Sequence, residues 1–357
     1  MTSTHSDSNT RVESSAIASA LNHSDISFGV AVTSGQARPC GTGQLADSYQ
    51  VRLEYVDGAQ GPDSIFVKLP PTDAHSASTA QRINAFGREH YFYTDLLPHL
   101  DINTPRFLGT IELPDGTTGL VLEDLADTTR PLDQLADGTV TQATSVLSGL
   151  AGLQAPFWND VDAAGGAGHF YNRTTDHIHG LADRYQQSWH QYRDSVGAGL
   201  DQNLRELIEL FGEHCIDWAA SISGPQTLTH QDLRLDNLLW SDESGAVLID
   251  WQTLAFTTPA WDPAFFLGTA LRPEDRREVE RGLIRSHVDN LAERGISDWG
   301  FDTAWTEHRR LSGSVLLAMV AALAFVAPTD RGFDMFASLI VRGAQQAVDL
   351  DLREFLN

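Results

Sequence analysis

The feature that most constrains this chain is a run of polar residues at fixed spacing between His230 and Trp251, in the segment HQDLRLDNLLWSDESGAVLIDW. Asp232 and Asn237 lie five residues apart, and Asp250 follows Asn237 by thirteen residues. The apolar stretch before Asp250 reads as a strand that returns from a hairpin, which would leave this carboxylate at the strand end. The segment therefore predicts a turn and a hairpin that bring one amide and two carboxylates to one place.

An amide and two carboxylates are the groups that phosphoryl transfer requires. Asp232 is predicted to orient an attacking hydroxyl and to accept its proton late in the transfer. Asn237 and Asp250 are predicted to hold Mg²⁺ through side-chain oxygens. Arg234 is predicted to meet the transferring phosphoryl group, and His230 to brace the loop rather than take part in the chemistry.

Composition and charge limit the classes of protein to which the chain can belong. With 357 residues, of which 41% are hydrophobic and 20% charged, it fits a globular protein with two lobes. The formal net charge of −24 argues against DNA, RNA or an anionic membrane as the main partner. Two cysteines, Cys40 and Cys215, cannot form a disulfide framework, and the polar N-terminus does not resemble a signal peptide. We therefore expect a cytoplasmic protein.

Positive charge is supplied by arginine throughout the chain, with one exception. Of the 24 basic residues only Lys68, in SIFVKLP, is a lysine. Lysine offers a compact ammonium on a flexible stem, whereas arginine offers a wide planar fork. A position that needs a point charge close to phosphate oxygens would explain the exception, although an ordinary lysine at a strand end would give the same sequence.

The first third of the chain predicts a small antiparallel sheet with a helix. Alternation of apolar and polar residues predicts strands at 49–56, 64–69, 105–113 and 118–122, the first two forming a hairpin. Helices are expected at 16–22 and 82–97, loops at 35–48 and 70–80, and a disordered tail at 1–15.

The remaining two-thirds of the chain predicts mainly helices. They are expected at 141–157, 176–196, 204–221, 273–293, 303–326 and 332–350. The longest apolar run, 315–327, is too short to span a bilayer and predicts a buried helix. We expect an α+β fold with an N-terminal lobe at 16–125 and a C-terminal lobe at 126–357.

Together these elements resemble the aminoglycoside phosphotransferase and choline kinase superfamily, and most closely its ecdysteroid-kinase-like branch. The phrases that carry the resemblance are GTGQLADS, VLEDLAD, GLQAPFW, HQDLRLDNLLW, LIDWQ and WDPAFFL, in the expected order. The resemblance implies a two-lobed protein-kinase-like fold, with a small antiparallel-sheet lobe for the nucleotide and a larger, mainly helical catalytic lobe. It also implies that ATP and Mg²⁺ are used to phosphorylate a hydroxyl group of a small molecule.

The same resemblance implies which residues bind the nucleotide. A strand lysine contacts the phosphates and is held by a helix glutamate, here Lys68 and Glu89. Gly41 and Gly43 stand where the phosphate-covering loop begins, and glycine lets backbone N–H groups approach phosphate oxygens. Backbone groups from Glu123 to Leu125 would bond the edge of the purine at a hinge between the lobes.

Some positions depart from the family pattern or have two interpretations. Gln231 stands where glycine is usual, and Gln154 stands where relatives often carry histidine. Asp262 resembles the carboxylate that braces the catalytic loop, but it could equally cap its own helix. His177 and His179 lie two apart on an expected helix and point away from each other, so we expect no metal site there.

The acceptor is the part of the function that the sequence leaves open. An acidic site would suit a polycationic aminoglycoside. The aromatic residues between Trp158 and Tyr192 would suit a steroid or another apolar alcohol, although core packing explains them better. The alternative from another class is a catalytically silent nucleotide-binding regulator, but such proteins commonly lose the lysine, the base or a metal ligand. A protein kinase is disfavoured by Trp251 and Gln252, which stand where protein kinases have Phe-Gly.

Overall fold

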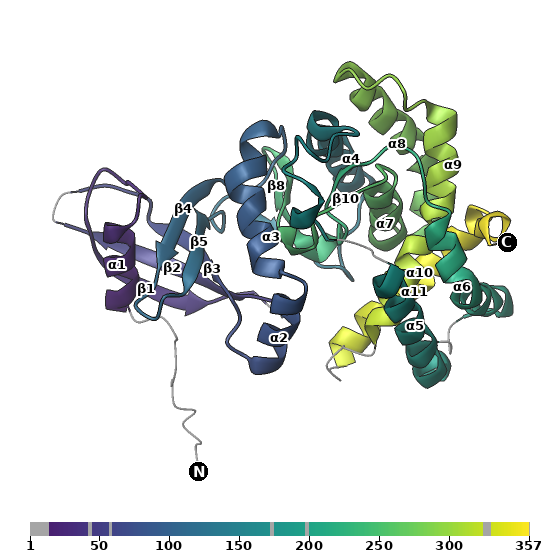
Figure 1. Ribbon diagram of the computed structural model, residues 1–357, viewed down its shortest axis with the longest axis horizontal. Helices are drawn as coiled ribbons and strands as arrows, with labels where there is room; N and C mark the ends of the chain where they lie inside the picture. Colours follow the sequence, from purple (N-terminus) through teal and green to yellow (C-terminus); the bar gives the residue numbers. More distant parts are fainter. Residues whose placement is uncertain are drawn as a thin grey trace, which may run out of the picture. The chain divides into compact units, whose positions relative to one another are not determined.

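The structure is a computed structural model that describes residues 14–41, 45–56, 59–171, 175–196, 200–323 and 330–356. The chain divides into two compact units (Figure 1). The first is Met1–Pro98 with Thr104–Thr129, and the second is His99–Asn103 with Arg130–Asn357. The sequence predicted a boundary a few residues earlier, after residue 125, and assigned 99–103 to the first lobe.

Backbone hydrogen bonds explain why the short segment His99–Asn103 belongs to the second unit. The N–H of Asp101 donates to the carbonyl of Gly152 over 3.3 Å, and the carbonyl of Asn103 accepts from Leu248 over 2.8 Å. Both bonds cross more than forty residues of chain, so a local sequence pattern gives no sign of them.

The first unit is built on a five-stranded antiparallel sheet with the order β1-β2-β3-β5-β4. Its strands are β1 (Val32–Pro39), β2 (Asp47–Tyr55), β3 (Ser64–Leu69), β4 (Phe107–Glu112) and β5 (Thr118–Glu123). Its helices are α1 (Ser14–His23), α2 (Ala74–Arg82), α3 (Ala85–Tyr91) and the π-helical turn η1 (Phe92–Leu96). Helix α1 lies against β1 (Figure 1). The four strands predicted from alternation are all present within a few residues.

Alternation along β3 separates the side chains that enter the apolar core from those on the opposite face of the sheet. Ile65, Val67 and Leu69 are buried in one apolar cluster with residues of α1, including Ile17. Because successive strand residues point to opposite faces, Lys68 is directed to the other face of the sheet.

Three local expectations in the first unit were wrong. Residues 35–39, expected in a loop, continue β1, and Pro39 is tolerated because β1 is an edge strand. Part of the expected loop 70–80 forms α2, because Asp73 caps it by accepting the N–H of Ser76 over 2.9 Å. The expected helix 82–97 is interrupted at Asn84, whose φ of 51° is left-handed.

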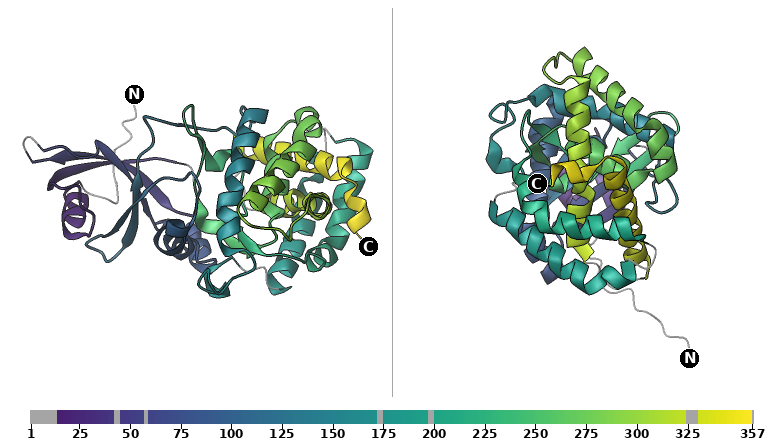
Figure 2. Two further views of the ribbon diagram at one scale, coloured as in Figure 1. Left: turned by 90° about the horizontal axis from the view of Figure 1, so that it is seen from above. Right: turned by 90° about the vertical axis from the view of Figure 1, so that its right-hand side faces the viewer.

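The second unit contains eight α-helices among its described residues. They are α4 (Val140–Gln154), α5 (Thr175–Val196), α6 (Gln202–Ala220), α7 (Trp261–Ala270), α8 (Pro273–Glu293), α9 (Phe301–Leu311), α10 (Gly313–Ala322) and α11 (Asp330–Asp349). Two small antiparallel sheets join them, β6 (Arg130–Pro131) with β8 (Leu238–Ser241) and β9 (Gly245–Leu248), and β7 (Thr227–Thr229) with β10 (Ala255–Thr257). Figure 2 shows α5 and α6 side by side, consistent with their packing contacts.

Helix α7 is the centre of this unit, since all ten of its residues are buried. The expected helix 303–326 is divided at Ser312, after which α10 begins. A side chain at Gly313 would come within 2.5 Å of the Phe211 ring, so the division places the smallest residue at this close approach. Helix α10 is apolar and almost wholly buried, and no helix in the described parts of the chain is long and apolar enough to cross a membrane.

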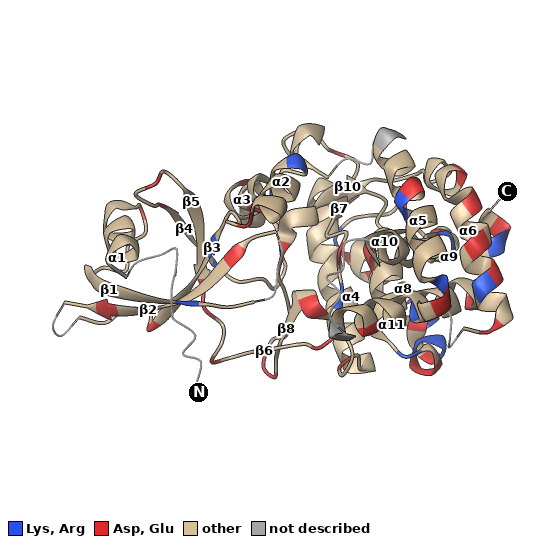
Figure 3. Ribbon diagram, turned by 90° about the horizontal axis from the view of Figure 1, so that it is seen from below, with Lys and Arg blue, Asp and Glu red and all other residues tan. Residues whose placement is uncertain are grey.

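A buried polar cluster ties three of the outer helices together. Glu280 of α8 accepts hydrogen bonds over 2.9 Å from His308 of α9 and from Gln346 of α11, and it pairs with Arg276. Arg276 also pairs with Asp349 of α11. Burial works to raise the pKa of Glu280, but these partners lower it below its usual value. Figure 3 shows acidic and basic residues along the same helices.

Gln154, which stands where relatives often carry histidine, joins four parts of the second unit. Its Nε2 donates to the carbonyl of Pro259 over 3.0 Å, and its backbone carbonyl accepts from the Thr227 hydroxyl. Its Oε1 lies 2.9 Å from Nε2 of His287, so the imidazole donates to it. Burial first, and then the nearby His308, lowers the pKa of His287 to about 4.

This low pKa makes the stability of the second unit sensitive to acid. In the unfolded chain His287 regains an ordinary pKa near 6.5. Between that value and about 4 the unfolded state binds the proton and the folded state does not. Stability should therefore be fully present above pH 6.5 and fall by roughly 3 kcal/mol as the pH approaches 4. The free energy of unfolding, measured in urea across this range, tests the expectation.

His287→Gln isolates this contribution from that of the carboxylates. Glutamine can still donate to Gln154 but does not titrate, so its stability curve should be flatter between pH 6.5 and 4. His190→Gln, at an exposed position on α5, should leave the slope unchanged. Equal slopes for the wild type and His287→Gln would contradict the assignment.

Candidate active site

In the first unit, Lys68 and Glu89 form a buried ion pair. The Lys68 ammonium lies 2.7 Å from a Glu89 carboxylate oxygen, and the two residues are 8% and 1% exposed. Strand β3 directs Lys68 away from the apolar cluster, and α3 brings Glu89 to the same face. The predicted contact between the lone lysine and the helix glutamate is confirmed. A buried pair of this kind holds an ammonium in one position.

Of the two predicted loop glycines, Gly41 and Gly43, the structure describes only Gly41. Gly41 has a φ of 80°, in the left-handed region that favours glycine. The N–H of Cys40 donates to the carbonyl of Ser48 over 2.9 Å and closes the base of the loop. Gly43 lies outside the described residues. The predicted role of both glycines in covering phosphates stays a prediction.

The segment after β5, predicted to hold a purine, is partly bonded within the first unit. The N–H of Glu123 donates to the carbonyl of Arg106 over 2.9 Å. The carbonyl of Leu125 accepts from the N–H of Thr129 over 2.9 Å and from its hydroxyl over 2.8 Å. These two backbone groups are therefore engaged, and a purine would use the other backbone groups of the segment.

Asp124, between Glu123 and Leu125, fixes the segment to the sheet. Its carboxylate accepts from the Ser64 hydroxyl over 2.5 Å and from the Gln50 amide over 2.8 Å. Burial works to raise the pKa of Asp124, but these hydrogen bonds lower it below its usual value. The carboxylate thus stays charged and holds the chain where it leaves β5.

In the second unit, the buried carboxylate of Asp262 holds the backbone of residues 230–237. These residues carry the predicted base and are called the catalytic segment below. It accepts from the N–H of His230 over 2.7 Å and from the N–H of Gln231 over 3.0 Å. Gln231 has a φ of 71°, which explains why glycine is usual at this position. Asp262 is fully buried, and burial raises its pKa despite these bonds. Its expected bracing of the loop is confirmed.

His230 is a positioning residue. Its imidazole is fully buried and donates from Nε2 to the carbonyl of Ile249 over 2.9 Å. The ring also packs on Trp251, with 4.8 Å between centroids. His230 therefore fixes the two residues on either side of Asp250, as the expectation that it braces the loop requires.

Asp232 lies in a small network of charged groups. The Arg234 Nε donates to its two carboxylate oxygens over 3.2 and 3.4 Å, and Arg234 Nη1 donates to Asp236 over 2.8 Å. Burial works against the charge of Arg234, but the two carboxylates raise the pKa of the guanidinium. Asn237 Nδ2 donates to the Asp232 carboxylate over 2.9 Å and to its carbonyl over 2.7 Å.

The hairpin of β8 and β9 brings Asn237 close to Asp250. Leu238 pairs with Leu248 across it, and the N–H of Ile249 donates to the Asn237 carbonyl over 3.1 Å. The spacing of thirteen residues is therefore the length of one short hairpin. Asp250 has a φ of 70°, an unusual backbone conformation for aspartate of the kind that concentrates at functional sites.

The chemistry of these two side chains fits a magnesium ion. Since Asn237 Nδ2 faces Asp232, the oxygen of its amide faces elsewhere, and Asp250 supplies a carboxylate at a strand end. No group of three or more His, Cys, Asp or Glu suited to a metal occurs among the residues that the structure describes. A pair of oxygen ligands is what Mg²⁺ needs when phosphates supply further oxygens.

Sequence reasoning missed Gln134, which supports the turn that ends at Asn237. Its buried amide accepts from the N–H of Leu235 over 3.0 Å and donates to the carbonyl of Thr269 over 3.0 Å. Its own N–H donates to Asp236 over 3.0 Å. Gln134 thus connects the catalytic segment to the end of α7. In the sequence it appears as one polar residue in a polar stretch.

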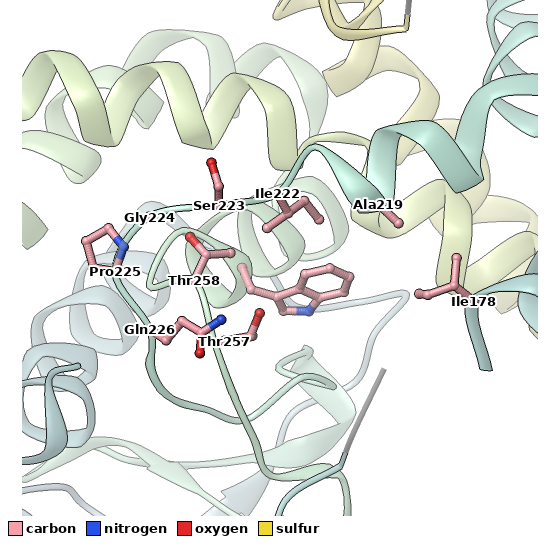
Figure 4. Close-up of a pocket in the computed structure, with 10 residues that line it drawn as sticks. Ile178, Ala219, Ile222, Ser223, Gly224, Pro225, Gln226, Thr257 and Thr258 are labelled. Carbon is pink, nitrogen blue, oxygen red and sulfur yellow. The ribbon is translucent and has the colours of Figure 1, made fainter. Parts of the chain in front are cut away.

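A separate pocket of about 150 Å³ lies near the start of β7 (Figure 4). It is lined by Ile178, Ala219, Ile222, Ser223, Gly224, Pro225, Gln226, Thr257, Thr258 and Trp261. None of the predicted site residues lines it. Trp261 connects it to the catalytic segment, because its indole N–H donates to the carbonyl of Gln231 over 3.4 Å.

Several side chains between Trp158 and Tyr192 contact other side chains of the second unit. His177 Nε2 contacts the hydroxyl of Tyr171 over 2.8 Å. Tyr185 and Trp189 are buried, so core packing explains them as expected. Tyr192 is only half-buried, and its ring lies 6.0 Å from that of Phe333 on α11.

Comparison with protein families gives one match that spans most of the chain. Residues 36–296 match the model of a family described as "Phosphotransferase enzyme family". A comparison with curated protein sequences gives no match. The narrower resemblance to the ecdysteroid-kinase-like branch stays a prediction.

Solved structures with the same fold include several phosphotransferases. A macrolide 2'-phosphotransferase from Brachybacterium faecium is 20% identical with a TM-score of 0.50, over 91% of this chain and 97% of that chain. A GDP complex of an aminoglycoside 2'-phosphotransferase is 17% identical with a TM-score of 0.53, over 93% and 94%. A Plasmodium vivax ethanolamine kinase is 11% identical with a TM-score of 0.52, over 90% and 83%. These similarities confirm the predicted kinase-like fold.

Replacement of Asp262 tests whether its hydrogen bonds to His230 and Gln231 stabilise the protein. In Asp262→Asn one acceptor oxygen becomes an NH₂ group that faces a buried N–H. We expect the free energy of unfolding to fall by about 2 kcal/mol, because a buried donor loses its charged acceptor. Urea unfolding at neutral pH measures the change.

The matched control is Asp289→Asn, at an exposed position on α8. It should change the free energy of unfolding by less than about 0.5 kcal/mol. If the two variants were equally stable, the proposed dependence of the loop on Asp262 would be wrong.

Proposed function

Because the chain belongs to the phosphotransferase enzyme family, we propose that it is a kinase that transfers the γ-phosphoryl group of ATP to a hydroxyl group of a small molecule. The observation that carries the proposal is the network of the second unit. There Asp232 is bonded to both Arg234 and Asn237, and a hairpin brings Asn237 close to Asp250. Few structural roles would require these groups in this arrangement.

The nucleotide is proposed to bind through residues of the first unit. Lys68 would contact the α- and β-phosphates, because Glu89 holds its ammonium in one position. Gly41 and Gly43 would allow backbone N–H groups to approach the phosphates. The carbonyl of Glu123 and the N–H of Leu125 are the groups proposed to bond the purine.

Asn237 and Asp250 are proposed to hold Mg²⁺. The ion would neutralise charge on the phosphate oxygens during the transfer. The two protein ligands would fix its position, since His230 and the hairpin restrain the backbone around Asp250. In a GDP complex of a similar structure the nucleotide is a guanine nucleotide, so both ATP and GTP belong in any test.

Asp232 is proposed to position the acceptor and to remove its proton. The acceptor oxygen forms a new bond to the γ-phosphorus while the bond to the bridging oxygen of ADP breaks. The hydroxyl proton passes to the Asp232 carboxylate late in this step. Arg234 holds that carboxylate in place and supplies positive charge close to the phosphoryl group.

Replacement of the base separates transfer from binding. In Asp232→Asn the proton acceptor is lost while Lys68 and the metal ligands remain. We expect turnover with the acceptor to fall by about 10²-fold or more. The thermal shift caused by Mg-nucleotide should persist. Steady-state kinetics and a thermal-shift titration measure the two effects.

Asp236→Asn is the matched control, since Asp236 also pairs with Arg234 but is not the proposed base. It should retain at least about a tenth of the wild-type turnover. Full turnover of Asp232→Asn would remove Asp232 from the mechanism. Nucleotide binding by the wild type without transfer to any hydroxyl compound would favour a silent regulator instead.

The lone lysine gives a second test. In Lys68→Arg the charge is kept, but the wider guanidinium does not fit the buried position beside Glu89. We expect kcat/KM for the nucleotide to fall about 10²-fold, equivalent to about 2.7 kcal/mol. Kinetics at varied nucleotide concentration measure it.

Arg82→Lys is the reverse change at an exposed position at the end of α2. It should leave kcat/KM within about twofold. A Lys68→Arg variant as active as Arg82→Lys would show that the compact ammonium is not needed.

A further inference from the structure

The first half of α11 lies beside the catalytic segment of the second unit. Arg234 pairs with Asp232 and also contacts Met335 of α11, with 3.8 Å between Nη1 and Sδ. An acceptor hydroxyl that gives its proton to Asp232 has to lie about 3 Å from that carboxylate. The guanidinium of Arg234 contacts both Asp232 and Met335, so these two side chains lie close together. An acceptor bound at Asp232 would therefore also lie next to this part of α11.

Helix α11 offers mainly apolar side chains in this region. Its half-buried residues between 332 and 338 are Gly332, Phe333, Met335, Phe336, Ala337 and Ser338. The acidic residue in the same stretch, Asp334, is exposed. A thioether and aromatic rings bind an apolar skeleton by removing its surface from water, and they offer no counter-charge to an ammonium group.

Helix α5 extends the same surface. The ring of its half-buried Tyr192 lies 6.0 Å from the ring of Phe333.

The charges around Asp232 do not favour a polycation. The two carboxylates nearest to Arg234, those of Asp232 and Asp236, are both paired with its guanidinium. Recognition of several ammonium groups needs several carboxylates that are free to pair with them. The half-buried positions of α11 between 332 and 338 provide none.

We propose that the acceptor is an alcohol with a large apolar skeleton, such as a macrolide or a steroid alcohol, held by Phe333, Met335 and Tyr192 with its hydroxyl at Asp232. The proposal rests on the kinase function proposed above and names the acceptor class of that site. The general acidity of the chain is then a property of its surface and does not select the acceptor.

Three compounds test the proposal on the full-length protein: a macrolide, a steroid alcohol and kanamycin. Binding is measured by equilibrium dialysis without nucleotide, and transfer is measured by release of ADP and by mass spectrometry of the acceptor. We expect at least one apolar alcohol to bind and to be phosphorylated, and kanamycin to do neither.

Variants of α11 assign the binding to the proposed surface. Met335→Glu and Phe333→Ala should each raise the acceptor KM about tenfold or more, while the nucleotide KM stays within about twofold. Met335→Leu should restore near-normal values, and Asp334→Asn, next to both positions, should behave as the wild type.

The outcomes separate this inference from the kinase proposal. Phosphorylation of kanamycin would overturn the apolar acceptor and leave the kinase function intact. Failure of both apolar alcohols to bind a protein that still binds Mg-nucleotide would also overturn it. Absence of any Mg-nucleotide binding would contradict the kinase function, although acceptor binding measured by dialysis would still report on the surface.

Discussion

Two hydrogen bonds to one buried carboxylate determine the conformation of the catalytic segment. Asp262 is fully buried, so its charge is tolerated only while the N–H groups of His230 and Gln231 point at it. Helix α7, which carries Asp262, is buried on all sides and is held by Gln346 of α11 through the carbonyl of Ala264. The position of Asp232 is therefore set by the helical core, and the strained backbone of Gln231 is the local consequence.

The parts of the site that the sequence predicted share a physical property: each follows from short-range geometry. The spacing from Asn237 to Asp250 is the length of a hairpin whose register pairs Leu238 with Leu248, and a register of this kind is specified by local alternation. The contact of Lys68 with Glu89 follows in the same way from alternation along β3, which separates the lysine from the apolar cluster.

What the sequence did not predict depends on contacts between distant residues. Gln134 supports Leu235 from 101 residues away, and nothing in its own segment distinguishes it from other polar residues of a loop. The division of the predicted long helix at Ser312 has a similar cause, because Gly313 meets the ring of Phe211. Helix α2 differs from these cases, since the cap of Asp73 on Ser76 is a local signal that could have been recognised.

The same distinction explains why the sequence predicts the chemistry more specifically than the acceptor. Asp232, Asn237 and Asp250 are proposed to meet a hydroxyl, a metal ion and phosphate oxygens, which are common to every acceptor, and they lie within one short segment. The side chains proposed to recognise the acceptor come from α5 and α11, more than a hundred residues apart, and Tyr192 and Phe333 meet only in the folded chain. Arg234 is bonded to Asp232 and in contact with Met335, so a change of acceptor class would alter the surroundings of the guanidinium that holds the base. Specificity and rate should therefore be coupled through this one side chain.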